Sequence, residues 1–206
     1  MLVHNGNIIT HNSKWFGSWY SPIPVPLGCV RVRTSDGLPP TVPSGVQTST
    51  SFESATLVEG TTDVYDVYKS GTNFNYLCLY CTNITEIIDS NIPHVTSMRS
   101  AFSSCRSLTY VDVKKFDTSR IIDMWGLFRA CGALTSIPMI KTDNAQDVQF
   151  MFEYCYNVET GILDMYNQLT TQAAPPPLYQ GCFAYCGTWT ESGTAENNQL
   201  PAIWRT

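Results

Sequence analysis

The sequence has few charged residues, and this scarcity excludes some classes of partner. Asp, Glu, Lys and Arg make up 14% of the 206 residues, against roughly a quarter in an average soluble domain. Nucleic-acid binding rests on basic side chains that neutralise phosphates. The chain has only 12 Lys and Arg and a net charge of −5. We therefore expect no nucleic-acid partner.

Long hydrophobic runs are also missing. No segment approaches the roughly 18 consecutive apolar residues that a membrane-spanning helix needs, so we expect no membrane partner. The first residues, from Met1 to Asn7, lack the basic start and apolar core of a secretory signal. If Met1 is the native start, we expect synthesis in the cytoplasm without ordinary export.

Catalytic motifs are absent from the sequence. His4, His11 and His94 lie near no repeated acid or nucleophile, and no Gly-x-Ser-x-Gly, phosphate-loop or His-Glu-x-x-His motif occurs. The sequence therefore predicts a protein that is not an enzyme and needs no cofactor. The paired carboxylates of a glycosidase need no fixed local spacing, so a polysaccharide-degrading enzyme stays open as a third alternative.

What the sequence does contain is an internal repeat. The segments Met98–Cys105, Met124–Cys131 and Val148–Cys155 match, with apolar residues at i, i+3, i+4 and i+7, which is typical of one helix face. After each cysteine the pattern becomes Leu-x-x-Leu-x-Leu, which is typical of a leucine-rich-repeat strand. Degenerate copies end at Cys81 and Cys186. The steps between the five cysteines are 24, 26, 24 and 31 residues, and leucine-rich repeats measure about 20–29 residues.

This pattern predicts an α/β fold, a leucine-rich-repeat solenoid with one short helix and one short strand per turn. It would have about three full turns plus caps, because single repeats cannot bury their own apolar faces. The predicted core consists of the recurring apolar positions: Met98, Phe102, Cys105, Leu108, Met124, Phe128, Cys131, Leu134, Val148, Phe152 and Cys155.

Five of the eight cysteines stand at the same position of successive repeats. Cys78 with Cys81, and Cys182 with Cys186, are spaced like metal-ligand pairs. However, Cys81 and Cys186 occupy the repeat position, and a buried neutral thiol packs as a small apolar group. We therefore expect no metal. Disulfides between adjacent turns stay open.

The chain outside the repeats predicts two further regions. Residues 1–28 end in alternating prolines that favour an extended chain, and we interpret them as an N-terminal anchoring arm, with a cover on the repeats as the alternative. Residues 29–70 predict two or three β-strands that cap the repeats, and residues 71–206 form the repeat region with its C-terminal cap. The predicted anchoring residues are Ile8, Trp15, Phe16, Trp19 and Tyr20.

The repeats resemble those of BspA-like, mycoplasma-lipoprotein-type leucine-rich-repeat proteins. Phe116–Leu134 follows the consensus Phe-Asp-Thr-Ser-x-Val-x-x-Met-x-x-Met-Phe-x-x-Cys-x-x-Leu almost throughout, and the resemblance covers about residues 77–190. The copy at 142–148 departs from the consensus. The resemblance implies a binding or adhesion protein outside the cell.

Segments at both ends resemble phage-encoded members of this family. They include Asn5–Thr10, Val30–Gly37 and Leu200–Trp204. This resemblance implies a virion, tail or fibre protein, made in the bacterial cytoplasm and released by lysis, whose arm binds other virion proteins. A homo-oligomer such as a trimer stays open, and a bacterial cell-surface adhesin is the second alternative.

The outward positions of the predicted strands are the candidate ligand-binding residues. Hydroxyl, aromatic and acidic side chains in such an array suit recognition of a host surface protein or a glycan, although a strand that merely faces solvent explains them as well. The candidates are Glu86, Ile88, Thr109, Tyr110, Asp112, Ser136 and Pro138.

Overall fold

The structure, a computed structural model, describes residues 2–4, 7–9, 23–46, 50–187 and 197–206. In these ranges β1 (Leu2–His4) pairs with β2 (Asn7–Ile9) in an antiparallel hairpin. The other elements are β3 (Cys29–Thr34), β4 (Ser54–Leu57), β5 (Val64–Tyr68), β6 (Ile84–Asn91), β7 (Tyr110–Val111), helix α1 (Ile162–Thr171), the 3-10 helix η1 (Asn197–Gln199) and α2 (Ala202–Arg205).

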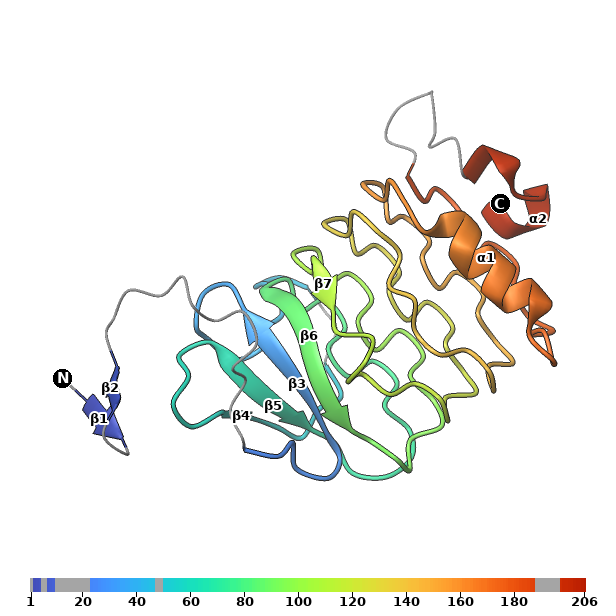
Figure 1. Ribbon diagram of the computed structural model, residues 1–206. Helices are drawn as coiled ribbons and strands as arrows, with labels where there is room; N and C mark the ends of the chain where they lie inside the picture. The colour runs from blue at the N-terminus through green and yellow to red at the C-terminus, as the bar shows by residue number, and fades with distance from the viewer. Residues whose placement is uncertain (1, 5–6, 10–22, 47–49, 188–196) are drawn as a thin grey trace.

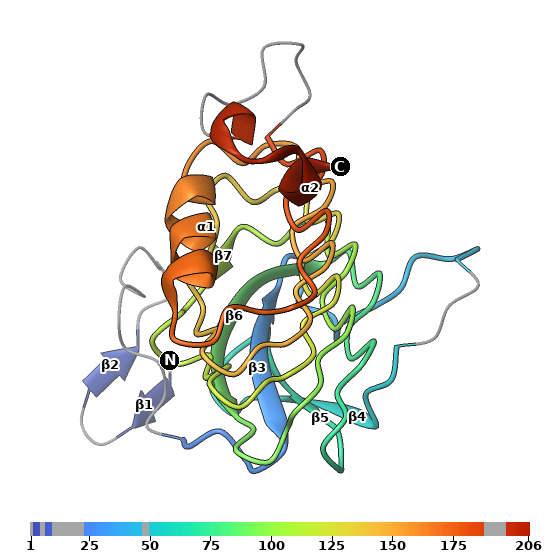
Figure 2. The same ribbon diagram turned by 90° about the vertical axis from the view of Figure 1, so that its right-hand side faces the viewer.

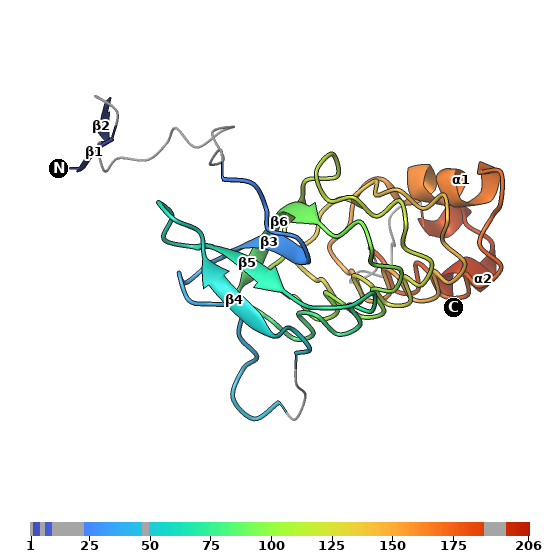
Figure 3. The same cartoon turned by 90° about the horizontal axis from the view of Figure 1, so that it is seen from below.

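Strands β3 to β7 form one open sheet in the order β4-β5-β3-β6-β7. All its pairs are antiparallel except β6 with β7, which run parallel. The sheet lies at one end of the molecule, a series of stacked loops follows it, and α1 and α2 lie at the other end (Figure 1; Figure 3 shows the same order from below). Because β3 pairs with both β5 and β6, residues on either side of the predicted division at residue 70 share one sheet and one core.

A buried ion pair fastens two central strands of this sheet. Arg31 on β3 donates from Nε and Nη2 to the two carboxylate oxygens of Asp66 on β5, at 2.7 and 2.8 Å. A third hydrogen bond runs from Arg31 Nη1 to the carbonyl of Ile23 at 3.0 Å. Arg31 is 2% exposed and Asp66 8%. The partners satisfy each other, as buried charges require.

Beyond the sheet, five short segments lie side by side, which we call the stacked turns. They comprise residues 73–81, 97–105, 123–131, 147–155 and 178–186, and parallel bridges join Asn73 to Ser97, Ser97 to Asp123, Asp123 to Asp147 and Asp147 to Leu178. Viewed along the molecule they project onto one another (Figure 2).

The prediction of a leucine-rich-repeat solenoid with a helix and a strand in each turn is wrong. The structure is a mixed five-stranded open sheet, and α1 and α2 are the only α-helices in the described residues. The segments expected to be helices, such as Met98–Cys105, are successions of tight turns. Of the strands expected after each repeat cysteine, Cys105 is followed by the two-residue β7, and Cys131 by the single bridge between Ser136 and Thr160.

The backbone explains why no helix forms there. Ser100 and Ser104 have φ of 53° and 60°, and Gly126 and Ala130 in the next turn both have 58°, a conformation incompatible with a right-handed helix. Alternate N–H groups therefore point at the neighbouring turn, and Ser100 donates to the carbonyl of Trp125 at 2.8 Å. The intervening N–H groups bond three residues back within their own turn. Every second hydrogen bond is thus made between turns.

Phenylalanine rings stack through the interior of these turns. Phe102, Phe128, Phe152 and Phe183 form one column, with successive ring centroids 6.1, 5.7 and 5.9 Å apart and planes within 14° of parallel. All four are fully buried. Trp204 of α2 continues the column against Phe183 at 6.2 Å. A single apolar core therefore runs from the sheet to the C-terminal helix.

A column of thiols runs beside the phenylalanines. Cys105, Cys131 and Cys155 each donate from Sγ to a carbonyl of the preceding turn, at 3.3, 3.2 and 3.1 Å. All eight cysteines are free and buried. The other predicted core residues, including Met98, Leu108, Met124, Leu134 and Val148, are at most 1% exposed.

The last stacked turn is covered by the C-terminal residues. Gly181 and Phe183 donate their N–H groups to the carbonyls of Ile203 and Trp204, at 2.9 and 2.8 Å. These two hydrogen bonds satisfy donors that would otherwise lack a further turn to bond. Helix α1 buries Ile162, Met165 and Leu169, and its Tyr166 packs edge-on against Trp204 at 5.2 Å.

Candidate functional site

Four of the predicted ligand-binding residues reach the surface on the sheet side. Thr109, Tyr110 and Ser136 are exposed, and Asp112 is half-buried. Tyr110 on β7 is 55% exposed. Asp112 accepts the N–H of Lys114 and Thr109 donates its hydroxyl to the carbonyl of Thr85, so both side chains have local backbone partners. Their role in binding stays a prediction.

The other three predicted residues make contacts within the fold or are buried in it. Glu86 on β6 forms an ion pair with Arg33 at 3.2 Å. Ile88 is 4% exposed and packs with Val58 and Val64, and Pro138 is also buried. The expectation that Ile88 and Pro138 face outward is therefore wrong. For Ile88, the bulges in the β3–β6 pairing shift the alternation on which that expectation depended. Pro138 lies in no strand, so the alternation of a strand does not apply to it.

Most of the predicted anchoring residues lie in a part of the chain that the structure does not describe. Trp15, Phe16, Trp19 and Tyr20 lie outside the described residues, and Ile8 belongs to β2, paired with Val3. The anchoring role stays a prediction.

The outer face of the stacked turns carries a first column of an arginine and aromatic rings. Arg99 lies over the ring of Trp125 at 5.1 Å, and Trp125 packs edge-on against Phe150 at 5.6 Å. Arg99 also pairs with Asp123 and Asp147, both at 3.0 Å. These contacts connect three turns, so the column supports the stack.

A second column lies beside the first. Arg129 lies over Tyr154 at 5.2 Å, and Tyr154 stacks on Tyr185 at 5.1 Å. Arg129 also pairs with Glu153, whose charge raises the pKa of the neighbouring Tyr154 phenol. In both columns the cations have acidic partners and the rings contact other groups, so neither column leaves a free cation for a ligand.

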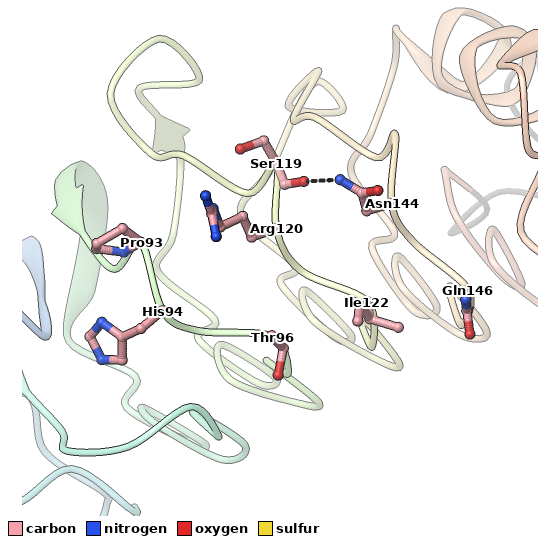
Figure 4. Close-up of a pocket in the computed structure, with 8 residues that line it drawn as sticks. All are labelled: Pro93, His94, Thr96, Ser119, Arg120, Ile122, Asn144 and Gln146. Carbon is pink, nitrogen blue, oxygen red and sulfur yellow. Dashed lines mark hydrogen bonds between the residues drawn. The ribbon is translucent and has the colours of Figure 1, made fainter.

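A groove of about 560 Å³ crosses a different side of the stacked turns (Figure 4). Its volume falls in the range of about 300–1,000 Å³ usual for small-molecule sites. Three segments line it, each leading into one stacked turn. The lining residues are Pro93, His94, Thr96, Ser119, Arg120, Ile122, Asn144 and Gln146.

The backbone holds these segments in register. Ile122 donates its N–H to the carbonyl of Thr96, and Gln146 donates to that of Ile122, both at 2.8 Å. Between the lining residues of each segment, one residue is buried: Val95, Ile121 or Ala145. The lining residues on either side of it are exposed or half-buried, so their side chains reach the surface. Equivalent positions of three repeats therefore meet in the groove.

The groove differs electrostatically from the acidic molecule that bears it. None of its eight lining residues is a carboxylic acid. Arg120 is exposed, and the described residues place no carboxylate within ion-pair distance of it. In Figure 4 its side chain extends toward the segment that carries Pro93 and His94. The groove thus holds an available guanidinium among neutral hydrogen-bonding groups.

The thiols are placed for packing and not for chemistry. Burial raises the pKa of Cys155 from 9.0 to about 12 and that of Cys29 to about 11, and it raises the pKa of Cys105 and Cys131 strongly as well. Such thiols are protonated at neutral pH and are poor nucleophiles. Across the described ranges, no three His, Cys, Asp or Glu side chains are grouped to hold a metal ion.

Sequence reasoning missed the groove, although a signal was present. Most of its lining residues stand directly before and after the recurring apolar residue of Thr-Ser-x-Val-x-x-Met, as Arg120 and Ile122 do around Ile121. A comparison of the residue before this apolar position in successive repeats would have selected His94, Arg120 and Asn144 together.

Comparison with protein families gives one match. The family described as "Mycoplasma protein of unknown function, DUF285" matches residues 47–166, which include the whole groove. This match agrees with the resemblance to mycoplasma-lipoprotein-type proteins and does not extend to a phage origin. No curated protein and no solved structure matches the chain. No helix in the described ranges is long and apolar enough to cross a membrane.

Proposed function

We propose a non-enzymatic binding role in surface adhesion for this chain, which belongs to the DUF285 family of Mycoplasma proteins of unknown function. The groove carries this proposal. It is built from equivalent positions of three repeats, and hydroxyl, amide, imidazole and guanidinium groups line it. The hydrogen bond drawn among these residues joins Asn144 to Ser119, and none joins His94 to a hydroxyl (Figure 4). Such a lining can hold a ligand by hydrogen bonds but shows no paired nucleophile and base.

The particle on which we place this protein is a phage virion. The N-terminal residues would bind other virion proteins, and the stacked turns would project toward the host surface. The resemblance of both chain ends to phage-encoded members supports this placement. A rigid stack with one continuous core suits display, because groups held on a rigid scaffold lose little entropy on binding.

Two measurements test this function. Mass spectrometry of purified virions should detect the chain at a fixed ratio to the capsid protein, and the purified chain added in excess should slow adsorption of the phage to its host. Absence from washed virions, together with no effect on adsorption, would contradict the proposal.

The second candidate is a bacterial cell-surface adhesin, and the family match to mycoplasma-type proteins favours it. It predicts that antibodies against the stacked turns label intact bacteria that carry the gene when no phage is being produced. Labelling only during phage production would support the virion placement instead.

A further inference from the structure

Arg120 lies in the groove without a carboxylate partner among the described residues. Arg31, Arg99 and Arg129 each pair with a carboxylate of the chain, whereas Arg120, like the exposed Arg106, does not. Unlike Arg106, Arg120 lines a groove that contains no acid. A guanidinium presents a rigid fork of donors that matches a carboxylate in two-pronged geometry. The guanidinium of Arg120 is therefore available to pair with a carboxylate of a ligand.

The rest of the lining suits a ligand with many hydroxyl groups. Thr96 and Ser119 offer hydroxyls, and Asn144 and Gln146 offer amides, so both donors and acceptors are present. The amide of Asn144 donates to the carbonyl of Ser119 at 2.6 Å, which fixes its orientation. Ile122, 42% exposed, adds an apolar surface between them.

A peptide strand fits this groove less well. Strand addition needs free N–H and C=O groups along an edge. Here the N–H groups of Ile122 and Gln146 are bonded to the carbonyls of Thr96 and Ile122. Recognition must then come from side chains, and these match hydroxyl groups rather than a backbone.

We propose that the groove binds an acidic oligosaccharide, with Arg120 holding a sugar carboxylate and the neutral residues of the neighbouring turns bonding sugar hydroxyls. This inference rests on the proposed adhesion function and names its ligand class. Segments of three consecutive repeats line the groove, so consecutive sugar units meet equivalent positions of consecutive repeats.

Calorimetric titration of the full chain tests the ligand class. The probes are hexamers of galacturonate and of glucuronate and an oligomer of sialic acid, each compared with a neutral hexamer of galactose. At least one acidic probe should bind on the order of tenfold more tightly than the neutral one, as expected for one charge-assisted hydrogen-bonding pair. The affinity should fall as salt is added, because the pair is exposed.

Matched variants identify the groove as the site. Arg120→Gln should lose about tenfold in affinity for the acidic probe, while Arg106→Gln, which removes an exposed arginine elsewhere, should bind like the unaltered chain. Ile122→Asp places a repelling carboxylate in the groove and should abolish binding, whereas Ile122→Asn, of the same size without the charge, should retain it. Unchanged thermal unfolding of each variant shows that the fold is intact.

The outcomes separate this inference from the function on which it rests. Equal binding of acidic and neutral probes, binding of none of them at millimolar concentration, or equal affinity of the Arg120 and Arg106 variants would each overturn the ligand assignment. The adhesion function would survive those results if the chain is still found on virions and slows adsorption.

Discussion

The stacked phenylalanines allow a direct test of how the turns support one another. Phe128 and Phe152 are fully buried, with ring centroids 5.7 Å apart and planes 11° from parallel. Replacing either ring by leucine keeps most of the volume, so the change in packing alone should cost about 1 kcal/mol, in addition to the lost contacts between rings. An aromatic pair contributes about 0.5–1.5 kcal/mol beyond its buried area. The double variant should therefore lose less stability than the two single losses added together, by about 1 kcal/mol.

A second cycle provides the control. Phe102 and Phe183 lie at the two ends of the phenylalanine column and share no ring neighbour. Because two further rings separate them, their leucine variants should be additive within about 0.5 kcal/mol. The comparison isolates the contact between adjacent rings from any general loosening of the core.

Urea denaturation followed by circular dichroism measures the free energies of unfolding, with the slope of each transition checked against that of the unaltered chain. Equal coupling in the adjacent and the separated pair would refute the reasoning, because the rings would then act through the whole core. No coupling in either pair would show that the column of rings adds nothing beyond burial.

Three further predictions follow from charge, burial and backbone conformation. Asp66→Ala leaves its buried arginine unpaired and should cost about 3–5 kcal/mol in urea denaturation, whereas Asp117→Ala, whose pair with a lysine is 56% exposed on both sides, should cost under about 1 kcal/mol. Because burial raises the pKa of Cys155 from 9.0 to about 12, the folded state keeps protons that the unfolded state releases. The contribution of these thiols to stability should therefore be constant below about pH 9 and fall between about pH 9 and 12, by up to about 1.4 kcal/mol per pH unit for each such thiol. A thiol reagent at pH 8 should label the chain only after unfolding. Gly181→Ala puts a methyl group 2.7 Å from a phenylalanine ring and should lower the melting temperature more than Gly126→Ala, whose new methyl group meets its nearest atom at 3.3 Å; equal losses would contradict the clash.

The repeat itself was readable from the sequence. The recurrence of Phe and Cys about every two dozen residues predicted which side chains are buried together, and Phe102, Phe128 and Phe152 do stack. Apolar periodicity reports burial reliably, because water is excluded from these side chains whatever the backbone does.

The local structure of each repeat was not readable in the same way. Spacings of three, four and seven residues fit an α-helix, but they also fit successive tight turns with a positive φ at every fourth residue, as at Ser100 and Ser104. Each such residue costs about 1–2 kcal/mol in isolation, so local preference argues against it. The hydrogen bonds between turns and the buried rings offset that cost, and both depend on the neighbouring repeat.

The sequence by itself determined the period of the chain, the identity of its core and its shortage of basic residues. The tertiary structure alone decided the open sheet, the hand of each backbone turn and the groove around Arg120. The reason is the range of the interactions. Burial depends on each side chain's own chemistry. In contrast, the acceptor of a backbone N–H group and the side chains around an arginine depend on segments some two dozen residues away.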